Sequence, residues 1–160
     1  MRLPFCCFKA CILGAVLLPA LCALADDDTD DCAFFKQALE QLSLSTHLTI
    51  VNDGDELMNY LLENSDHPPH VLFLDINMPR KNGLECLSEI KQNIRLKDMP
   101  VVMFSTSYTS DKNYEQSMID VLYKMGAQGF IRKPGEFTEL KQVIHDALVE
   151  VIGKARSMEK

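Results

Sequence analysis

The chain has 160 residues, of which 47% are hydrophobic and 24% charged, and its seven glycines and seven prolines form no biased tract. This composition is typical of one globular domain and excludes a collagen, a repeat array, a long disordered linker and, at this length, a multi-domain enzyme. From Asp26 onward 14 basic residues stand against 23 acidic ones, an excess of nine negative charges. Because such a field repels phosphate backbones, we expect no direct nucleic-acid partner.

The N-terminal segment, residues 1–19, is apolar after a short basic start, and Ala23-Leu24-Ala25 has the spacing of a secretory cleavage site. The uninterrupted apolar run covers residues 10–25, which is 16 positions, whereas a helix needs about 20 to span a bilayer. Residues 1–19 are therefore interpreted as signal-like, or as a surface helix that lies on the domain or on a membrane. A misassigned start of the chain is a third interpretation.

From residue 20 onward, short apolar runs alternate with segments of helical periodicity, which is the pattern of a parallel sheet with crossover helices. A first strand is predicted at residues 20–25, although Ala and Leu favour a helix there and β-branched residues are missing. A helix capped by Asp30 or Asp31 follows at residues 32–42. Its predicted apolar face comprises Phe34, Phe35, Ala38, Leu39 and Leu42.

The next strand is predicted at residues 48–51, and the next helix at residues 55–64. The buried face of that helix should comprise Leu57, Met58, Leu61 and Leu62. The continuous apolar run at residues 71–74 is too short for a buried helix and indicates a central strand buried on both faces. The remaining pattern predicts, in chain order, a helix at 84–94, a strand at 101–104, a helix at 114–125, a strand at 129–131 and a helix at 137–152.

These elements predict one α/β domain of five strands and five helices at residues 20–153, followed by a tail at 154–160. Polar side chains follow four of the strands. They are Asp26-Asp27-Asp28, Asp75, Ser105-Thr106 and, past Arg132, Lys133-Pro134. Because the carboxyl ends of parallel strands meet at one edge of an open sheet, we expect these groups to lie close together.

Carboxylates that face one another at about 4 Å repel by about 4 kcal/mol per pair at an effective dielectric constant of 20, so such a cluster needs a cation. Asp27 and Asp75, with Asp26 acting through water and a backbone carbonyl, would give the all-oxygen octahedron that Mg²⁺ prefers. Lys133 would neutralise the charge that the metal leaves. A carboxylate beside Mg²⁺ and an ammonium group can attack phosphorus, and Asp75 is the natural acceptor.

The segment VLFLDINMPRKNG places Met78-Pro79 and Gly83 three, four and eight residues after Asp75. With the acidic, hydroxyl and Lys-Pro pairs in the same order, residues 26–153 resemble the receiver domain of two-component response regulators. The resemblance implies a flavodoxin-like, doubly wound parallel sheet with strand order 2-1-3-4-5. More loosely, the Asp-rich first turn and the turn at residues 52–55 resemble stand-alone, phytochrome-associated regulators.

By that resemblance, Asp75 accepts a phosphoryl group from a sensor histidine kinase or a histidine phosphotransfer protein. Mg²⁺ would be bound by Asp27, Asp75 and the backbone carbonyl of Asn77, while Asp26 would orient a metal-bound water. A receiver phosphorylates and dephosphorylates itself but turns over no other substrate, so the resemblance implies a signalling protein and not an enzyme.

The same resemblance assigns the groups around the phosphate. The Ser105 hydroxyl and the Thr106 N–H would donate hydrogen bonds to phosphoryl oxygens, and Lys133 would pair with the phosphate. The Lys133–Pro134 peptide bond would be cis.

Ser105 and Phe130 would form a switch, in which Ser105 moves toward the phosphate and the Phe130 ring turns inward. The surface of the helix at 114–125, the strand at 129–131 and the helix at 137–152 would change and bind a downstream protein. Phe in place of the family's Tyr lacks a hydroxyl, so the inward state would gain packing but no hydrogen bond. A simple core aromatic is the alternative role for Phe130.

Three other functions share part of this residue pattern. A haloacid-dehalogenase-like phosphatase also uses an Asp nucleophile, but in that family the nucleophile begins a D-x-D motif. Here Asn77, and not a second Asp, stands two residues after Asp75. An EF-hand would use Asp26, Asp28 and Asp30, yet its glycine and twelfth ligand would be Asp31 and Gln37. A purely structural flavodoxin-like domain leaves the convergence of polar groups unexplained.

Secretory cleavage after Ala25 would remove the first strand and export a protein whose phosphodonors are cytoplasmic. We therefore expect residues 1–25 to be retained and the location to be cytoplasmic. Membrane association through residues 1–19 is the alternative.

Overall fold

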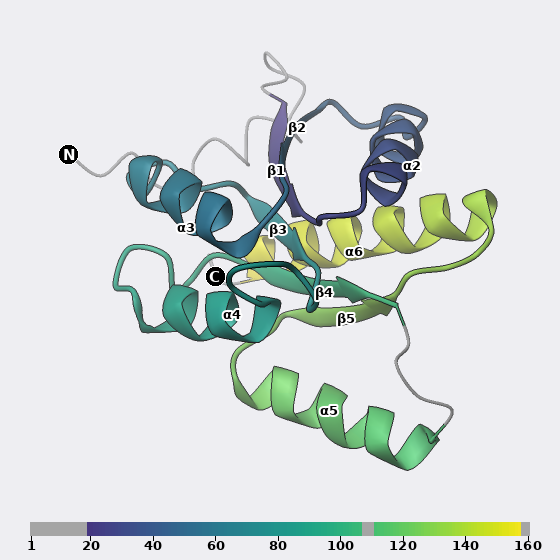
Figure 1. Ribbon diagram of the computed structural model, residues 1–160. Helices are drawn as coiled ribbons and strands as arrows, with labels where there is room; N and C mark the ends of the chain where they lie inside the picture. Colours follow the sequence, from purple (N-terminus) through teal and green to yellow (C-terminus); the bar gives the residue numbers. More distant parts are fainter. Residues whose placement is uncertain (1–18, 107–110, 158–160) are drawn as a thin grey trace.

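The computed structural model describes residues 19–106 and 111–157, in which five parallel strands form one sheet in the order β2-β1-β3-β4-β5 (Figure 1). The strands are β1 (Ala20–Ala25), β2 (Thr46–Val51), β3 (Val71–Leu74), β4 (Val101–Ser105) and β5 (Gly129–Arg132). The helices are α2 (Thr29–Glu40), α3 (Gly54–Glu63), α4 (Gly83–Gln92), α5 (Lys112–Lys124) and α6 (Phe137–Ser157). The predicted flavodoxin-like α/β fold and strand order are confirmed.

The sheet is covered on both faces. Helices α2 and α6 pack on one face, and α3, α4 and α5 lie on the other (Figure 1). Alternate residues of β3 serve the two layers, since Leu72 and Leu74 join the α3–α4–α5 core and Phe73 joins the α2–α6 core. All four residues of β3 are buried, as the continuous apolar run predicted.

Strand β1 forms where local propensity favours a helix. It pairs with β2 along its whole length, from Ala20 opposite Thr46 to Ala25 opposite Val51, and on its other side with β3. Two neighbouring strands satisfy its backbone, and its small side chains fit the buried centre of the sheet, which outweighs the weak intrinsic preference. Cleavage after Ala25 would remove the strand that joins β2 to β3. The expectations for residues 1–18 lie outside the described residues.

Three details of the predicted helices are wrong. The side chain of Phe34 is 54% exposed and that of Leu62 is 50% exposed. Phe34 precedes the fully buried Phe35, and Leu62 follows the fully buried Leu61. One step along a helix turns a side chain about 100° away from the core. Helix α2 begins at Thr29 with Asp28 as its N-cap, in place of Asp30 or Asp31, because the Asp28 carboxylate accepts the N–H groups of both.

The last helix is longer than predicted. Helix α6 passes through Gly153 and ends at Ser157, so four residues of the predicted tail at 154–160 are helical. Glycine inside a helix costs only about 1 kcal/mol, which the rest of a long helix tolerates. Among the described residues, no helix combines the length and the apolar character needed to cross a membrane.

The start of α4 is packed tightly against the end of β3. Asn82 and Glu85 form a reciprocal capping box at this helix end, and the Gly83 N–H donates to the Ile76 carbonyl at 2.7 Å. A Cβ atom on Gly83 would overlap the Asp75 carbonyl oxygen and lie 2.8 Å from the Ile76 Cα. Glycine at this position therefore fixes how closely α4 approaches the residue after β3.

Gly83→Ala is expected to lower the free energy of unfolding by about 3 kcal/mol or more, because the added methyl overlaps backbone atoms that cannot move alone. Gly135→Ala is the matched control, since a Cβ there meets no atom within 4 Å. Urea unfolding followed by circular dichroism measures both variants. Equal unfolding midpoints for the two would contradict this close packing.

Candidate functional site

The carboxyl ends of β1 and β3 bring three carboxylates together. Carboxylate oxygens of Asp26, Asp27 and Asp75 lie within 4.8 Å of one another. Asp26 is fully buried and Asp75 is 5% exposed, whereas Asp27 points to solvent. Backbone hydrogen bonds extend the sheet to these residues, because the Asp26 N–H donates to the Val51 carbonyl at 3.0 Å and the Asp75 N–H donates to the Ala25 carbonyl at 2.9 Å. The acids are thus held in place by the sheet itself.

Lys133 reaches the same group of carboxylates from the end of β5. Its Nζ lies 2.6 Å from Asp26 Oδ2, 2.8 Å from Asp31 Oδ2 and 3.7 Å from Asp75 Oδ2. The Lys133 N–H donates to the Ser105 carbonyl at 2.9 Å, which fixes the backbone beneath the side chain. The Lys133–Pro134 peptide bond is trans, so the expectation of a cis bond is wrong.

Asp31 is a member of this cluster that was not predicted from the sequence, where it stands as a possible helix cap and as a mismatch to the EF-hand loop. A signal was present. Asp31 precedes the fully buried Phe35 by four residues, which places both on the core-facing side of α2.

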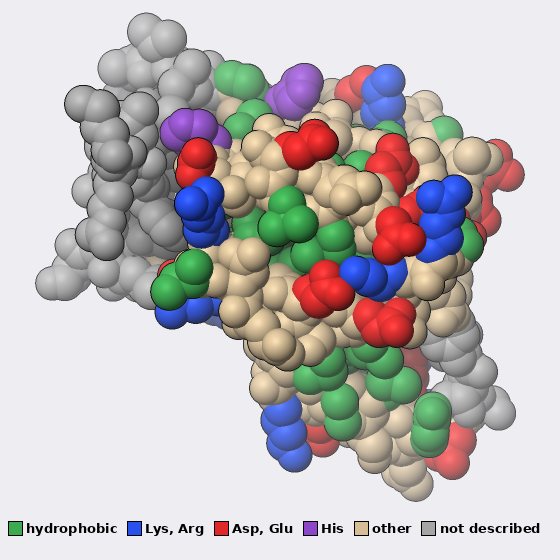
Figure 2. Space-filling view, turned by 60° about the vertical axis from the view of Figure 1, so that its left-hand side comes forward, with side chains coloured by type: hydrophobic (Ala, Val, Ile, Leu, Met, Phe, Trp, Pro, Cys, Tyr) green, Lys and Arg blue, Asp and Glu red, His purple; other side chains and the backbone are tan. Residues whose placement is uncertain are grey.

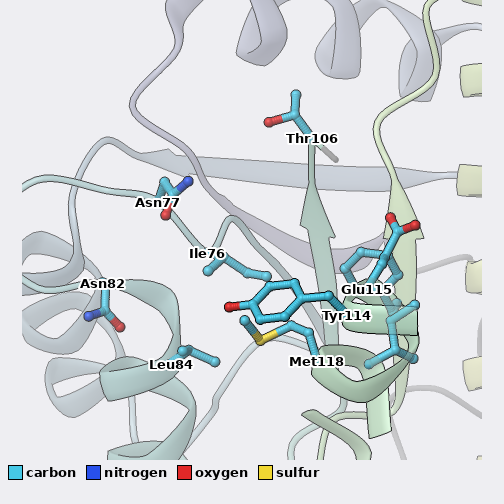
Figure 3. Close-up of a pocket in the computed structure, with 10 residues that line it drawn as sticks. Ile76, Asn77, Asn82, Leu84, Thr106, Tyr114, Glu115 and Met118 are labelled. Atoms are coloured by element: carbon cyan, nitrogen blue, oxygen red, sulfur yellow. The ribbon is translucent and has the colours of Figure 1, made fainter. Parts of the chain in front are cut away.

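The two hydroxyl residues after β4 occupy different positions. Ser105 is fully buried, and its hydroxyl donates to Asp75 Oδ1 at 2.8 Å. Thr106 is exposed and lies at the mouth of a pocket (Figure 3). Of the predicted site residues, the structure therefore joins Asp26, Asp27, Asp75, Ser105 and Lys133 in one group, with Thr106 beside it.

The site is short of positive charge. Burial raises the pKa of Asp26 and of Asp75 above the ordinary 3.8, because loss of water outweighs the hydrogen bonds and the nearby ammonium. Burial would lower the pKa of Lys133, but its contacts with Asp26 and Asp31 prevail and raise it. Among the described residues, Asp26 Oδ2 has no well-directed hydrogen bond despite the close ammonium. A buried carboxylate oxygen with spare acceptor capacity, in an all-oxygen cluster, fits a hard divalent cation.

The comparisons with known proteins identify the fold family. Residues 22–145 match the model of the response regulator receiver domain. The chain belongs to this family. Receivers act as phosphoacceptor signalling domains that interact with kinases and downstream targets, and the phosphatase alternative has no support.

Relatives by sequence include response regulators of several kinds. The chain is 34% identical over 97 residues to response regulator Rcp1 of Synechocystis sp., covering 58% of this chain and 66% of Rcp1. It is 31% identical to a CheY homolog of Campylobacter jejuni over 81% of this chain and 90% of that one. The match to the NarL protein of Escherichia coli spans 74% of this chain but only about half (51%) of NarL.

Similar solved structures include phytochrome response regulators. The Mn²⁺-bound form of Rcp1 has a TM-score of 0.68 at 27% identity, covering 79% of this chain and 89% of that one. The phosphorylated cyanobacterial phytochrome response regulator RcpA has a TM-score of 0.69 at 29% identity, with the same coverage. These structures are receivers with a divalent metal or a phosphoryl group, and both superpose on the fold described above.

A pocket of about 280 Å³ lies beside the carboxyl ends of β3 and β4. Thr106 and Asn77 lie at one end, and Phe130 lines its wall together with Tyr114 and Met118 of α5 (Figure 3). Phe130 is partly buried and packs against the α3–α4–α5 core. This pocket could not be predicted from the sequence, because helical periodicity alone does not show how far α5 stands from α4.

Asp75→Asn is expected to make the metal-free receiver unfold at a higher urea concentration at neutral pH. The pKa of Asp75 is raised by folding, so from pH 3.8 upward the unfolded chain ionises first and the stability of the parent falls. Removing the carboxylate removes that part of the decline. The difference in unfolding midpoint between variant and parent should therefore be small at pH 3.5 and grow toward pH 7. A difference that is constant with pH would contradict the raised pKa.

Proposed function

We propose that this receiver is a phosphorylation-dependent switch in which Asp75 takes a phosphoryl group from a sensor histidine kinase or a histidine phosphotransfer protein. The observation that carries the proposal is the position of the Asp75 carboxylate. It is buried at the carboxyl end of β3 and contacts the Ser105 hydroxyl at 2.8 Å and the Lys133 ammonium at 3.7 Å. The likeness to phytochrome response regulators supports a phytochrome-type sensor upstream.

Mg²⁺ is the cofactor in this proposal. The carboxylates of Asp27 and Asp75 and the carbonyl of Asn77 would hold it, and Asp26 would act through a water molecule. When bound, the ion supplies positive charge that offsets the charge on the phosphoryl oxygens in the transition state. The spacing of the three carboxylates within 4.8 Å supports this assignment.

The chain's own residues act as follows. A carboxylate oxygen of Asp75 attacks phosphorus in line, a P–O bond forms, and the P–N bond to the donor imidazole breaks with its electron pair going to nitrogen. Ser105 releases Asp75 Oδ1 and donates its hydroxyl to a phosphoryl oxygen. The Thr106 N–H and the Lys133 ammonium bind further phosphoryl oxygens.

Asp75→Asn is expected to abolish uptake of a phosphoryl group from acetyl phosphate with Mg²⁺, because an amide oxygen is not a competent nucleophile. The matched control is Asp98→Asn, an exposed residue before β4 and therefore at the opposite edge of the sheet. Intact mass spectrometry counts the added phosphoryl group. Equal labelling of the Asp75 variant and the control would overturn the assignment.

The output of the switch is proposed to lie on the surface formed by α5, β5 and α6. Helix α5 buries only Leu122 among its residues, while Tyr114, Val121 and Tyr123 are about half exposed, at 59%, 48% and 50%. Figure 2 shows hydrophobic side chains gathered over the lower part of the molecule, where α5 lies. A helix with so little buried surface can shift when Ser105 moves and the Phe130 ring turns inward. A downstream protein would bind there.

Phe130→Ala is expected to leave phosphoryl uptake in place and to weaken the response of α5. Hydrogen exchange of the α5 amides, with and without beryllofluoride and Mg²⁺ as a phosphoryl mimic, measures that response. Ile131→Ala is the control, because the Ile131 side chain packs on the opposite face of the sheet, in the α2–α6 core. A full response in Phe130→Ala would show that Phe130 is a core residue without a switching role.

The proposed location is cytoplasmic, because the phosphodonors of this family of signalling proteins act there. Membrane association through residues 1–19 is the alternative. Beyond transfer of the phosphoryl group onto and off its own Asp75, the proposal gives the chain no enzymatic turnover, and it includes no contact with nucleic acid.

A further inference from the structure

The ammonium of Lys133 is shared unequally among three carboxylates. It lies within 3 Å of Asp26 and Asp31, at 2.6 and 2.8 Å, but 3.7 Å from Asp75. The Lys133 side chain is only 9% exposed and passes over the Phe104 ring at 5.5 Å, so water competes little for its charge. In this arrangement the ammonium expected to bind the phosphoryl group lies closer to Asp26 and Asp31 than to Asp75.

Asp31 differs from the other two partners because it lies outside the group of carboxylates that could hold a metal. A cation bound among Asp26, Asp27 and Asp75 offsets the negative charge of Asp26 and weakens its attraction for Lys133. The charge of Asp31 has no such counterion. Asp31 is therefore the partner that keeps its full attraction for Lys133 when the metal site is filled.

The backbone that carries Asp31 is fixed. Its N–H donates to the Asp28 carboxylate at 3.1 Å in the first turn of α2, and the helix is anchored in the core by Phe35 and Leu39. The carboxylate also lies in the first turn of α2, at the positive end of the helix dipole. Asp31 is thus a negative charge held in place beside Lys133.

We propose that Asp31 competes with the phosphoryl group for Lys133 and so weakens the site's hold on that group. Asp31 is a positioning residue, since it acts through Lys133 and touches neither the metal carboxylates nor the phosphoryl group. The sign follows from charge, because a fixed negative group beside a site that must accept an anion opposes that anion and draws away its cation. The inference rests on the proposed function of Asp75.

The test compares Asp31→Asn with the parent in the full chain. With Mg²⁺ present, Asp31→Asn should bind beryllofluoride roughly tenfold more tightly, measured by ¹⁹F NMR titration, because one partly exposed charge is removed near the bound anion. The aspartyl phosphate formed from acetyl phosphate should also last longer. Asp31→Glu keeps the charge and should remain close to the parent, a pattern that a purely structural role would not produce.

Asp30→Asn is the matched control, because it removes the same charge from the same turn of α2, while the Asp30 side chain faces solvent and contacts no cation among the described residues. Unchanged or weaker beryllofluoride binding by Asp31→Asn overturns the inference, as does an equal gain in Asp30→Asn. If the parent binds no beryllofluoride and takes up no phosphoryl group, the proposed function fails as well. A parent that is labelled while Asp31→Asn matches it overturns only the role of Asp31.

Discussion

The contact between the Lys133 ammonium and the surrounding carboxylates is the interaction on which the site depends. Asp26 follows β1, Asp75 follows β3 and Asp31 lies on α2, so three separate segments meet at one cation. Carboxylates at about 4 Å repel by about 4 kcal/mol per pair at an effective dielectric constant of 20. Without an ammonium group among them, the compact arrangement of these acids would be unfavourable.

The sheet supplies the rigidity that this charge cluster requires. The N–H of Asp26 and that of Asp75 continue the ladder of backbone hydrogen bonds, and Gly83 lets α4 approach the end of β3 closely. Burial raises the pKa values of Asp26 and Asp75, because loss of water disfavours the charged carboxylate. The buried negative charge is therefore unfavourable without additional positive charge, and a divalent cation bound among the carboxylates would supply it.

The two faces of the sheet are packed differently, and the difference suits a switch. On one face the Phe35 ring packs edge-on against the rings of Phe73 and Phe104, with ring centroids 4.9 and 5.4 Å apart, in an aromatic layer under α2 and α6. On the other face α5 buries only Leu122 and borders an open pocket beside Phe130. The aromatic layer holds the sheet that carries Asp26 and Asp75, while the pocket on the other face leaves room for a change of conformation.

Local pattern and motif spacing were sufficient for the α/β class, the strand order implied by family resemblance, and the candidate residues Asp26, Asp27, Asp75 and Lys133. These follow from the sequence because strand ends in a parallel sheet meet at one edge, whatever the details of packing. The strand predicted at residues 20–25 runs against its local propensity, and its pairing with β2 and β3 explains why it forms. Only the tertiary structure decided that Phe34 faces solvent and that Asp31 holds Lys133. Each depends on partners distant in the chain, and the periodicity of a single segment contains no information about where such partners lie.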